Sequence, residues 1–132
     1  MRSIVVVTTV GTEDQAHLLS RELVARRLAA CVNILSGVRS VYRWHGKICR
    51  DSELLLVIKT LETEFEAVAE TIRELHTYEL PEILSFAVDR GEAGFLSWIG
   101  AAVDKSAGVH DEDDEDILQD ERHVDEIREQ EC

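Results

Sequence analysis

The sequence predicts an α+β protein with the ferredoxin-like βαββαβ order of elements, followed by one extra C-terminal helix. Strand and helix patterns alternate in that order, and the two middle strands adjoin without a helix between them. Right-handed crossovers would place both long helices on one face of a four-stranded antiparallel sheet. With 132 residues, the chain is long enough to bury one hydrophobic core.

The first strand and the first helix are predicted over residues 4–10 and 13–29. Residues 4–10 are a continuous run of apolar and β-branched side chains, typical of a strand buried on both faces. Gly11 ends this run. Thr12 and Gln15 then have the spacing of a helix capping box. The helix pattern consists of apolar side chains at helical spacing: Ala16, Leu19, Leu23, Val24 and Leu28.

A long β-hairpin is predicted next, over residues 31–44 and 48–60. Ser36–Gly37 interrupts its first strand and suggests a bulge rather than a full turn. Beyond this point, polar and apolar residues alternate between the two faces of the strand. His45–Gly46 supplies the turn, and the length of both strands predicts a hairpin that extends beyond the body of the domain.

Three further elements complete the predicted domain. Thr63 and Glu66 form a second capping-box pattern, and the apolar residues that follow, up to Leu75, give the clearest helix in the chain. Residues 83–88 are predicted to form the fourth strand. A short helix then closes the domain at about Asp104.

Charge divides the chain into a domain at residues 1–106 and an acidic tail at residues 107–132. The net charge is −13, and the last 24 residues contribute −10 of it through twelve acids and two arginines. Residues 111–116 are six adjacent acids that repel one another, so we expect the tail to be disordered or weakly helical. Neither part has the basic face that nucleic-acid binding needs, which argues against nucleic acid as a partner.

The apolar segments are too short for a membrane protein. No run of about 18 apolar residues is present. The apolar run near Met1 is also too short for a signal peptide, which predicts a cytoplasmic protein. The cysteines form no CxxC pair, so no zinc motif is indicated.

The predicted sheet is apolar on both faces. Val5 and Val7 point away from Ile4 and Val6, yet all four side chains are apolar. Two helices cover only one face of a sheet, so the other face needs a partner. The pattern therefore predicts self-association.

Five sequence blocks stand out together in register. They are residues 30–34, 40–48, 56–60, 75–83 and 95–99, and the segment 75–83 reads Leu-His-Thr-Tyr-Glu-Leu-Pro-Glu-Ile. With these blocks the chain resembles, over residues 4 to about 104, the CutA family of divalent-cation tolerance proteins. The resemblance implies a ferredoxin-like subunit in a tight trimer whose long hairpin reaches the neighbouring copy. It also implies a role in tolerance of copper and other divalent cations, without an enzymatic reaction.

The metal ligands predicted for a copper or other divalent-cation site are His76, Cys31 and Glu79. A neutral imidazole suits Cu(II), and a carboxylate three residues later could add an oxygen ligand. Cys31 could bind Cu(I) as a thiolate, or it could pack as a small apolar side chain. In place of His76-Thr77-Tyr78, family members usually read His-Pro-Tyr.

A cleft between subunits is the second predicted site, formed by Tyr42, Trp44, Lys59, Tyr78 and Glu82. In an alternative hypothesis the protein is a trimeric signalling or scaffold protein with the shape of the PII regulators, which binds a small anionic ligand or a partner at these clefts. Lys59, Tyr78 and Arg43 would then matter more than His76. The carboxylates of the segment 79–82 have no nucleophile, phosphate-binding loop or HExxH motif beside them. We therefore predict that the protein is not an enzyme.

Overall fold

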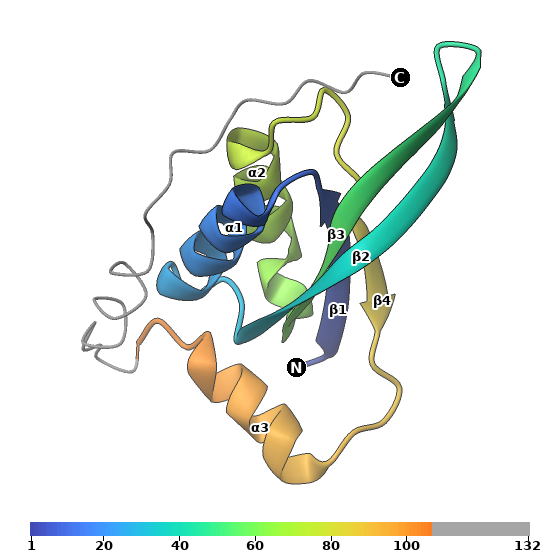
Figure 1. The fold of residues 1–132 in the computed structure, drawn as a ribbon. Coiled ribbons are helices and arrows are strands. Elements are labelled where there is room, and N and C mark those ends of the chain that lie inside the picture. Colours follow the sequence, from blue (N-terminus) through green and yellow to red (C-terminus); the bar gives the residue numbers. More distant parts are fainter. Residues whose placement is uncertain (107–132) are drawn as a thin grey trace.

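The computed structural model describes residues 1–106 of the chain. The acidic tail predicted for residues 107–132 lies outside the described residues. Figure 1 shows the elements in the predicted order, ending in an extra helix. They are β1 (Ser3–Val10), α1 (Glu13–Ala25), β2 (Cys31–Trp44), β3 (Lys47–Leu61), a 3-10 turn (Glu62–Glu64), α2 (Phe65–Leu75), β4 (Leu84–Ala87) and α3 (Ala93–Ala102).

The sheet has the strand order β2-β3-β1-β4, and all neighbouring strands are antiparallel. The helices α1 and α2 lie side by side on one face of the sheet, and the β2–β3 hairpin projects beyond it (Figure 1). The predicted ferredoxin-like fold is therefore confirmed, including the extended hairpin.

The hydrophobic core lies between the sheet and its two helices. Alternate residues of β1 and β3 point into it, as the period of two in a strand requires. Val6 and Ile58 are Cα partners in neighbouring strands, and both are fully buried. The largest fully buried apolar side chains from the helices are Leu19, Leu23, Val68 and Ile72.

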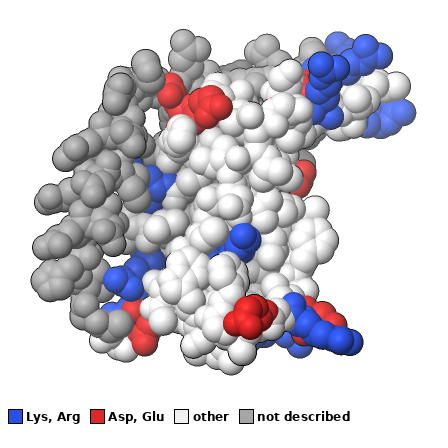
Figure 2. Space-filling model, turned by 60° about the horizontal axis from the view of Figure 1, so that its bottom comes forward, with Lys and Arg blue, Asp and Glu red and all other residues white. Residues whose placement is uncertain are grey.

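The opposite face of the sheet is apolar and largely open in the single chain. Phe86 and Leu84 on β4 are 54% and 52% exposed, and Leu35 on β2 is 45% exposed. Val5 and Val7 lie between them on β1 and are half-buried. Figure 2 shows a broad surface of uncharged residues on the described part of the molecule. The bare apolar face that the sequence predicts is therefore present.

The first helix ends four residues earlier than predicted, at Ala25. Arg27 has a φ of 58°, in the left-handed region, and this stops the helix. The Leu28 N–H donates to the Leu23 carbonyl, and the Arg27 N–H donates to the Val24 carbonyl. This is the Schellman pattern, here with arginine in the position that glycine usually occupies.

The second predicted capping box is also absent. The α2 helix begins at Phe65 after the 3-10 turn, and Glu64 at its N-cap makes no side-chain capping hydrogen bond. The Thr63 hydroxyl instead contacts the Glu64 carboxylate at 3.4 Å. At the first box only the N-cap half forms: the Thr12 side chain accepts from the Gln15 N–H, whereas the Gln15 side chain donates to the Leu75 carbonyl.

The hairpin has the two predicted irregularities. The register between β2 and β3 shifts between Leu35 and Val38, where the sequence predicted a bulge. His45 and Gly46 both have positive φ, as a tight type I′ hairpin turn requires. Beyond the bulge the two strands stay paired up to Trp44 and Lys47, so the ribbon extends away from the core without a further break.

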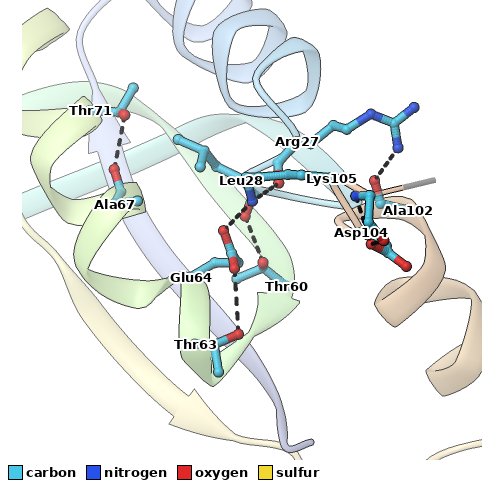
Figure 3. A network of polar contacts seen from close by, with 11 residues as sticks. Arg27, Leu28, Thr60, Thr63, Glu64, Ala67, Thr71, Ala102, Asp104 and Lys105 are labelled. Atoms are coloured by element: carbon cyan, nitrogen blue, oxygen red, sulfur yellow. Dashed lines mark hydrogen bonds and ion pairs between the residues drawn. The ribbon is translucent and has the colours of Figure 1, made fainter. Parts of the chain in front are cut away.

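Polar contacts join the C-terminal end of α1 to β3, the 3-10 turn and the segment after α3 (Figure 3). The Thr60 hydroxyl donates to the Leu28 carbonyl at 2.6 Å. The Lys105 ammonium donates to the Arg27 carbonyl at 3.0 Å and pairs with Glu64 at 2.6 Å. These contacts fix the irregular segment between α1 and β2 against the sheet.

Replacing Thr60 with valine should lower the free energy of unfolding by about 1–3 kcal/mol, because the buried Leu28 carbonyl loses its donor. Thr60 is fully buried, and valine keeps its shape. Urea unfolding of Thr60→Val beside Thr63→Val, which removes an exposed hydroxyl, measures the difference. Equal urea midpoints for the two variants would show that this hydrogen bond does not stabilise the fold.

Candidate functional site

A pocket of about 760 Å³ lies where the hairpin leaves the sheet and meets the segment after α2. The segment contributes its residues because α2 ends at Leu75 and β4 begins only at Leu84. Most of the walls are aromatic, carboxylate and aliphatic side chains, and the remainder are Thr9, Ser40 and one positive charge, Arg39. The first group consists of Val41, Tyr42, Trp44, Glu53, Tyr78, Leu80, Pro81, Glu82, Ile83 and Leu84. The pocket thus combines residues that are far apart in the sequence.

His76 lies at the base of this segment, with both ring nitrogens engaged. The Tyr78 N–H donates to Nδ1 at 3.0 Å, so Nδ1 carries no hydrogen. Nε2 therefore carries the hydrogen and donates it to the Thr9 carbonyl at 2.6 Å. Burial lowers the pKa of His76, although the Thr9 hydrogen bond and the charge of Glu53 oppose this shift. The imidazole is therefore neutral, and its hydrogen bonds connect the segment after α2 to β1.

Tyr78 connects His76 to a buried carboxylate. Its ring lies 4.5 Å from the His76 ring, centroid to centroid. Its hydroxyl donates to Glu53 at 2.7 Å, and both side chains are buried. Desolvation raises the pKa of Glu82, and the negative charge of Glu53 raises it further. The pocket therefore holds two carboxylates close enough to repel each other.

The predicted metal ligands do not come together within one chain. Cys31 is a free, half-buried thiol paired with Lys59 across the β2–β3 ladder. Thr9, which holds His76, lies at the level of Leu55, four residues along β3 from Lys59. At about 3.3 Å per residue, this places Cys31 and His76 at levels of the sheet roughly 13 Å apart. Glu79 is exposed and does not line the pocket.

Four of the five predicted cleft residues line the pocket: Tyr42, Trp44, Tyr78 and Glu82. The fifth, Lys59, lies elsewhere, with its ammonium 5.8 Å from the centre of the Phe95 ring of α3. The Tyr42 hydroxyl donates to Asp51 across the hairpin. The structure therefore places four of the five residues around one pocket and Lys59 apart from it, and the cleft between subunits stays a prediction.

The sequence analysis missed Glu53 and Thr9. Glu53 begins an apolar run on β3 and appears in the sequence as the polar start of a strand. In the structure its carboxylate is buried, accepts from Tyr78 and faces the pocket. The only feature of the sequence that could have identified Glu53 was a single acid at the start of a buried strand. Thr9 acts through its backbone carbonyl, which no side-chain pattern reveals.

Among residues 1–106, no three histidine, cysteine or acidic side chains are arranged to hold a metal ion. No helix in this part of the chain is long and apolar enough to cross a membrane. The fold and the site define a small α+β protein with an acidic, aromatic pocket beside a projecting hairpin.

Comparison with known proteins assigns the family. The family model of the CutA1 divalent ion tolerance protein matches residues 4–102. A divalent-cation tolerance protein CutA from Thermus thermophilus is 42% identical over 95 residues, which are 72% of this chain and 92% of the relative. The chain belongs to the CutA1 divalent ion tolerance protein family. These are non-catalytic tolerance proteins, so the prediction that the chain is not an enzyme is confirmed.

Solved structures agree with this assignment. CutA1 from Oryza sativa matches with a TM-score of 0.77 and 36% identity, covering 80% of this chain and 96% of that one. The Thermus thermophilus structure matches with a TM-score of 0.74 and 40% identity, covering 76% of this chain and 97% of that one.

Other relatives are longer or are assigned to different compartments. The match spans 55% of a chloroplastic rice CutA protein and 51% of mouse CutA. The CutA protein of known structure from Archaeoglobus fulgidus is described as periplasmic. Membership of the family therefore does not fix a compartment, and the predicted cytoplasmic location stays a prediction.

Proposed function

We propose that this protein is a homotrimeric, cytoplasmic divalent-cation tolerance protein that binds Cu(II) or another divalent cation at pockets where its copies meet. The observation that carries the proposal is the pair of carboxylates, Glu53 and Glu82, in one partly desolvated pocket. A bound divalent cation would relieve the repulsion between these two charges, and carboxylate oxygens are ligands for such ions.

The charge of the pocket favours a cation over the small anion of the alternative hypothesis. An anionic ligand would face Glu53 and Glu82, and only Arg39 brings a positive charge to the same walls. Lys59, on which anion binding would also depend, lies away from the pocket beside Phe95. The structure therefore gives no specific support to an anionic ligand here.

One chain offers too few ligands for a complete site, because residues 1–106 contain no cluster of three ligating side chains. A trimer would supply the missing groups where the open apolar sheet face meets another copy. His76 would become a ligand only by giving up its hydrogen bond with Thr9 or with Tyr78. We therefore assign first contact with the cation to Glu82 and Glu53, and a supporting position to His76.

Replacing Glu82 with glutamine should weaken cation binding at least about tenfold, because one of the two charges is lost. Isothermal titration of the full chain with Cu(II), and separately with Zn(II), measures this. The matched control is Glu79→Gln, which removes an equal charge three residues away, outside the pocket.

If Glu82→Gln binds the cation more weakly and Glu79→Gln binds it as tightly as the wild type does, the result would support the pocket as the cation site. The reverse result would return the site to the ligands predicted from the sequence, His76, Cys31 and Glu79. Identical isotherms for all three proteins would refute cation binding at either position.

A further inference from the structure

The outer end of the β2–β3 hairpin concentrates positive charge in an otherwise acidic protein. Acids outnumber Lys and Arg by 27 to 14 over the whole chain. Residues 39–50 nevertheless contain three arginines and one lysine, and no acid. Figure 2 shows these Lys and Arg side chains gathered at the protruding end of the molecule. The sequence analysis found no basic face of the kind that nucleic-acid binding needs, and it overlooked this cluster.

One face of the ribbon combines this charge with exposed apolar side chains. Val41 pairs with Arg50, and Arg43 pairs with Ile48, so these residues share a face. Val41 and Ile48 are each 67% exposed. We call this surface the basic hairpin face; it consists of Arg39, Val41, Arg43, Ile48 and Arg50.

The arginines of the basic hairpin face form no ion pair with any other residue of the described part of the chain. Elsewhere in residues 1–106, arginines and lysines are commonly paired, as Arg26 is with Glu22 and Glu74, and Lys105 with Glu64. A ribbon with three such arginines and two exposed aliphatic side chains matches a partner that is acidic and partly apolar.

We propose that the basic hairpin face binds the C-terminal segment of this protein's own tail, residues 117–131. That segment carries six acids and two arginines, a net charge of −4. It also carries four aliphatic residues between its acids: Ile117, Leu118, Val124 and Ile127. The segment therefore offers negative charge together with apolar side chains, the two properties that complement the face.

At Arg43 and Lys47, the outermost part of the hairpin, chain length selects this segment over the acidic run at residues 111–116. Ala30, at the start of β2, packs with Val103 of the segment after α3, so the tail leaves near the end of the ribbon opposite its turn. Arg43 lies twelve residues along β2 from Cys31, about 40 Å away. The acidic run ends at Asp116, ten residues beyond Ser106, a reach of about 34 Å that falls short of Arg43, whereas residues 120–131 can reach about 46–85 Å.

The distribution of lysines provides a direct test. The chain contains only three, Lys47 at the hairpin turn, Lys59 in the sheet and Lys105 next to the tail. A carbodiimide joins a lysine to a carboxylate only when the two are in contact. The full chain would be treated with carbodiimide under reducing conditions at low salt, and the linked peptides identified by mass spectrometry. We expect links from Lys47 to acids within residues 120–131, and none from Lys59.

The variant Arg43→Gln/Arg50→Gln should reduce the yield of the Lys47 links roughly two- to tenfold, as expected for the loss of two exposed ion pairs. The links should also diminish at about 1 M salt, where the screening length is about 3 Å. The control Arg73→Gln/Arg90→Gln removes two exposed arginines away from the hairpin and should leave the links unchanged.

Links from Lys105 report that the reaction worked, because Lys105 lies next to the tail in the sequence. Links from Lys105 to the tail without any from Lys47 would overturn the proposal. Equal yields of Lys47 cross-links in the two double variants would also overturn the proposal. Binding of a polyphosphate probe to the hairpin arginines, with no tail link, would assign the face to an external anion instead. None of these outcomes depends on cation binding in the pocket.

Discussion

A chain carrying Phe86→Asp should be monomeric in solution, whereas the wild-type protein should have three times the 14.9 kDa mass of one chain. Phe86 is 54% exposed on the open sheet face and pairs with Val5 across the β1–β4 ladder. Burying a phenylalanine contributes about 1.5–3 kcal/mol. Burying an unpaired carboxylate costs several kcal/mol instead, and a trimer would suffer that loss three times.

Light scattering coupled to size-exclusion chromatography, at micromolar concentration, measures this change. The control is Ser85→Asp, which adds the same charge one residue earlier on β4, where the side chain points to the opposite face of the sheet. A wild-type protein that is already monomeric would refute the trimer. A trimer that survives Phe86→Asp but not Ser85→Asp would place the interface on a different surface.

The fold could be predicted from the sequence because the hydrophobic periods are strong and local. The run at β1 and the helical spacing before Leu75 each lie within one element, so neighbouring residues alone determine them. The bulge and the turn of the hairpin were also marked locally, by Ser36–Gly37 and His45–Gly46. The open apolar sheet face was also predictable, because two helices cover only one side of an apolar sheet, and the self-association inferred from it stays a prediction.

The errors at element ends have a different cause, because tertiary contacts override local preference there. Leu28 has apolar spacing that continues α1, yet its carbonyl accepts from Thr60 of β3, and Arg27 adopts a left-handed conformation. Thr63 has capping-box spacing with Glu66, but a 3-10 turn comes first. Neither outcome is visible in a window of neighbouring residues.

The candidate site was predictable only in part, because its members come from separate strands. His76 and Tyr78 stood out within one short segment, and Tyr42 and Trp44 shared a strand face. The Thr9 carbonyl, however, is 67 residues from His76, and Glu53 is 25 residues from Tyr78. Lys59 was also predicted for the cleft, whereas in the structure its ammonium lies beside the Phe95 ring of α3.

Lowering the pH from 8 to 5 should destabilise the protein through His76. Its pKa is lowered in the folded state from the ordinary value of 6.5, chiefly by burial. The unfolded chain therefore takes up the proton first as the pH falls. The contribution of this residue to stability is complete above about pH 6.5, is lost below it, and stops changing once the pH is below the folded-state pKa. A protonated Nδ1 would also face the Tyr78 N–H, donor against donor.

The groups around His76 raise or lower its pKa, and with it the pH dependence of stability, in known directions. Glu53 favours the charged imidazole and reduces the shift, and the Thr9 carbonyl does the same. The pKa of Glu82 is raised, so the folded state takes up a proton at that carboxyl first, and its contribution to stability grows as the pH falls. At low pH, protonation of Glu82 therefore stabilises the fold while protonation of His76 destabilises it. The Glu82→Gln variant removes the first effect, so the contribution of His76 is easier to measure in that variant.

Two substitutions at His76 separate titration from hydrogen bonding. In His76→Gln the amide can still donate to Thr9, and in His76→Asn the carbonyl can still accept from Tyr78, but neither side chain titrates. Urea unfolding at pH 5, 6, 7 and 8, with and without Glu82→Gln, should give both His76 variants a flatter pH dependence than their parent. An unchanged slope in both would mean that His76 takes up its proton equally well in the folded and unfolded chains. The loop would then be held by Tyr78 and Glu53 rather than by the neutral imidazole.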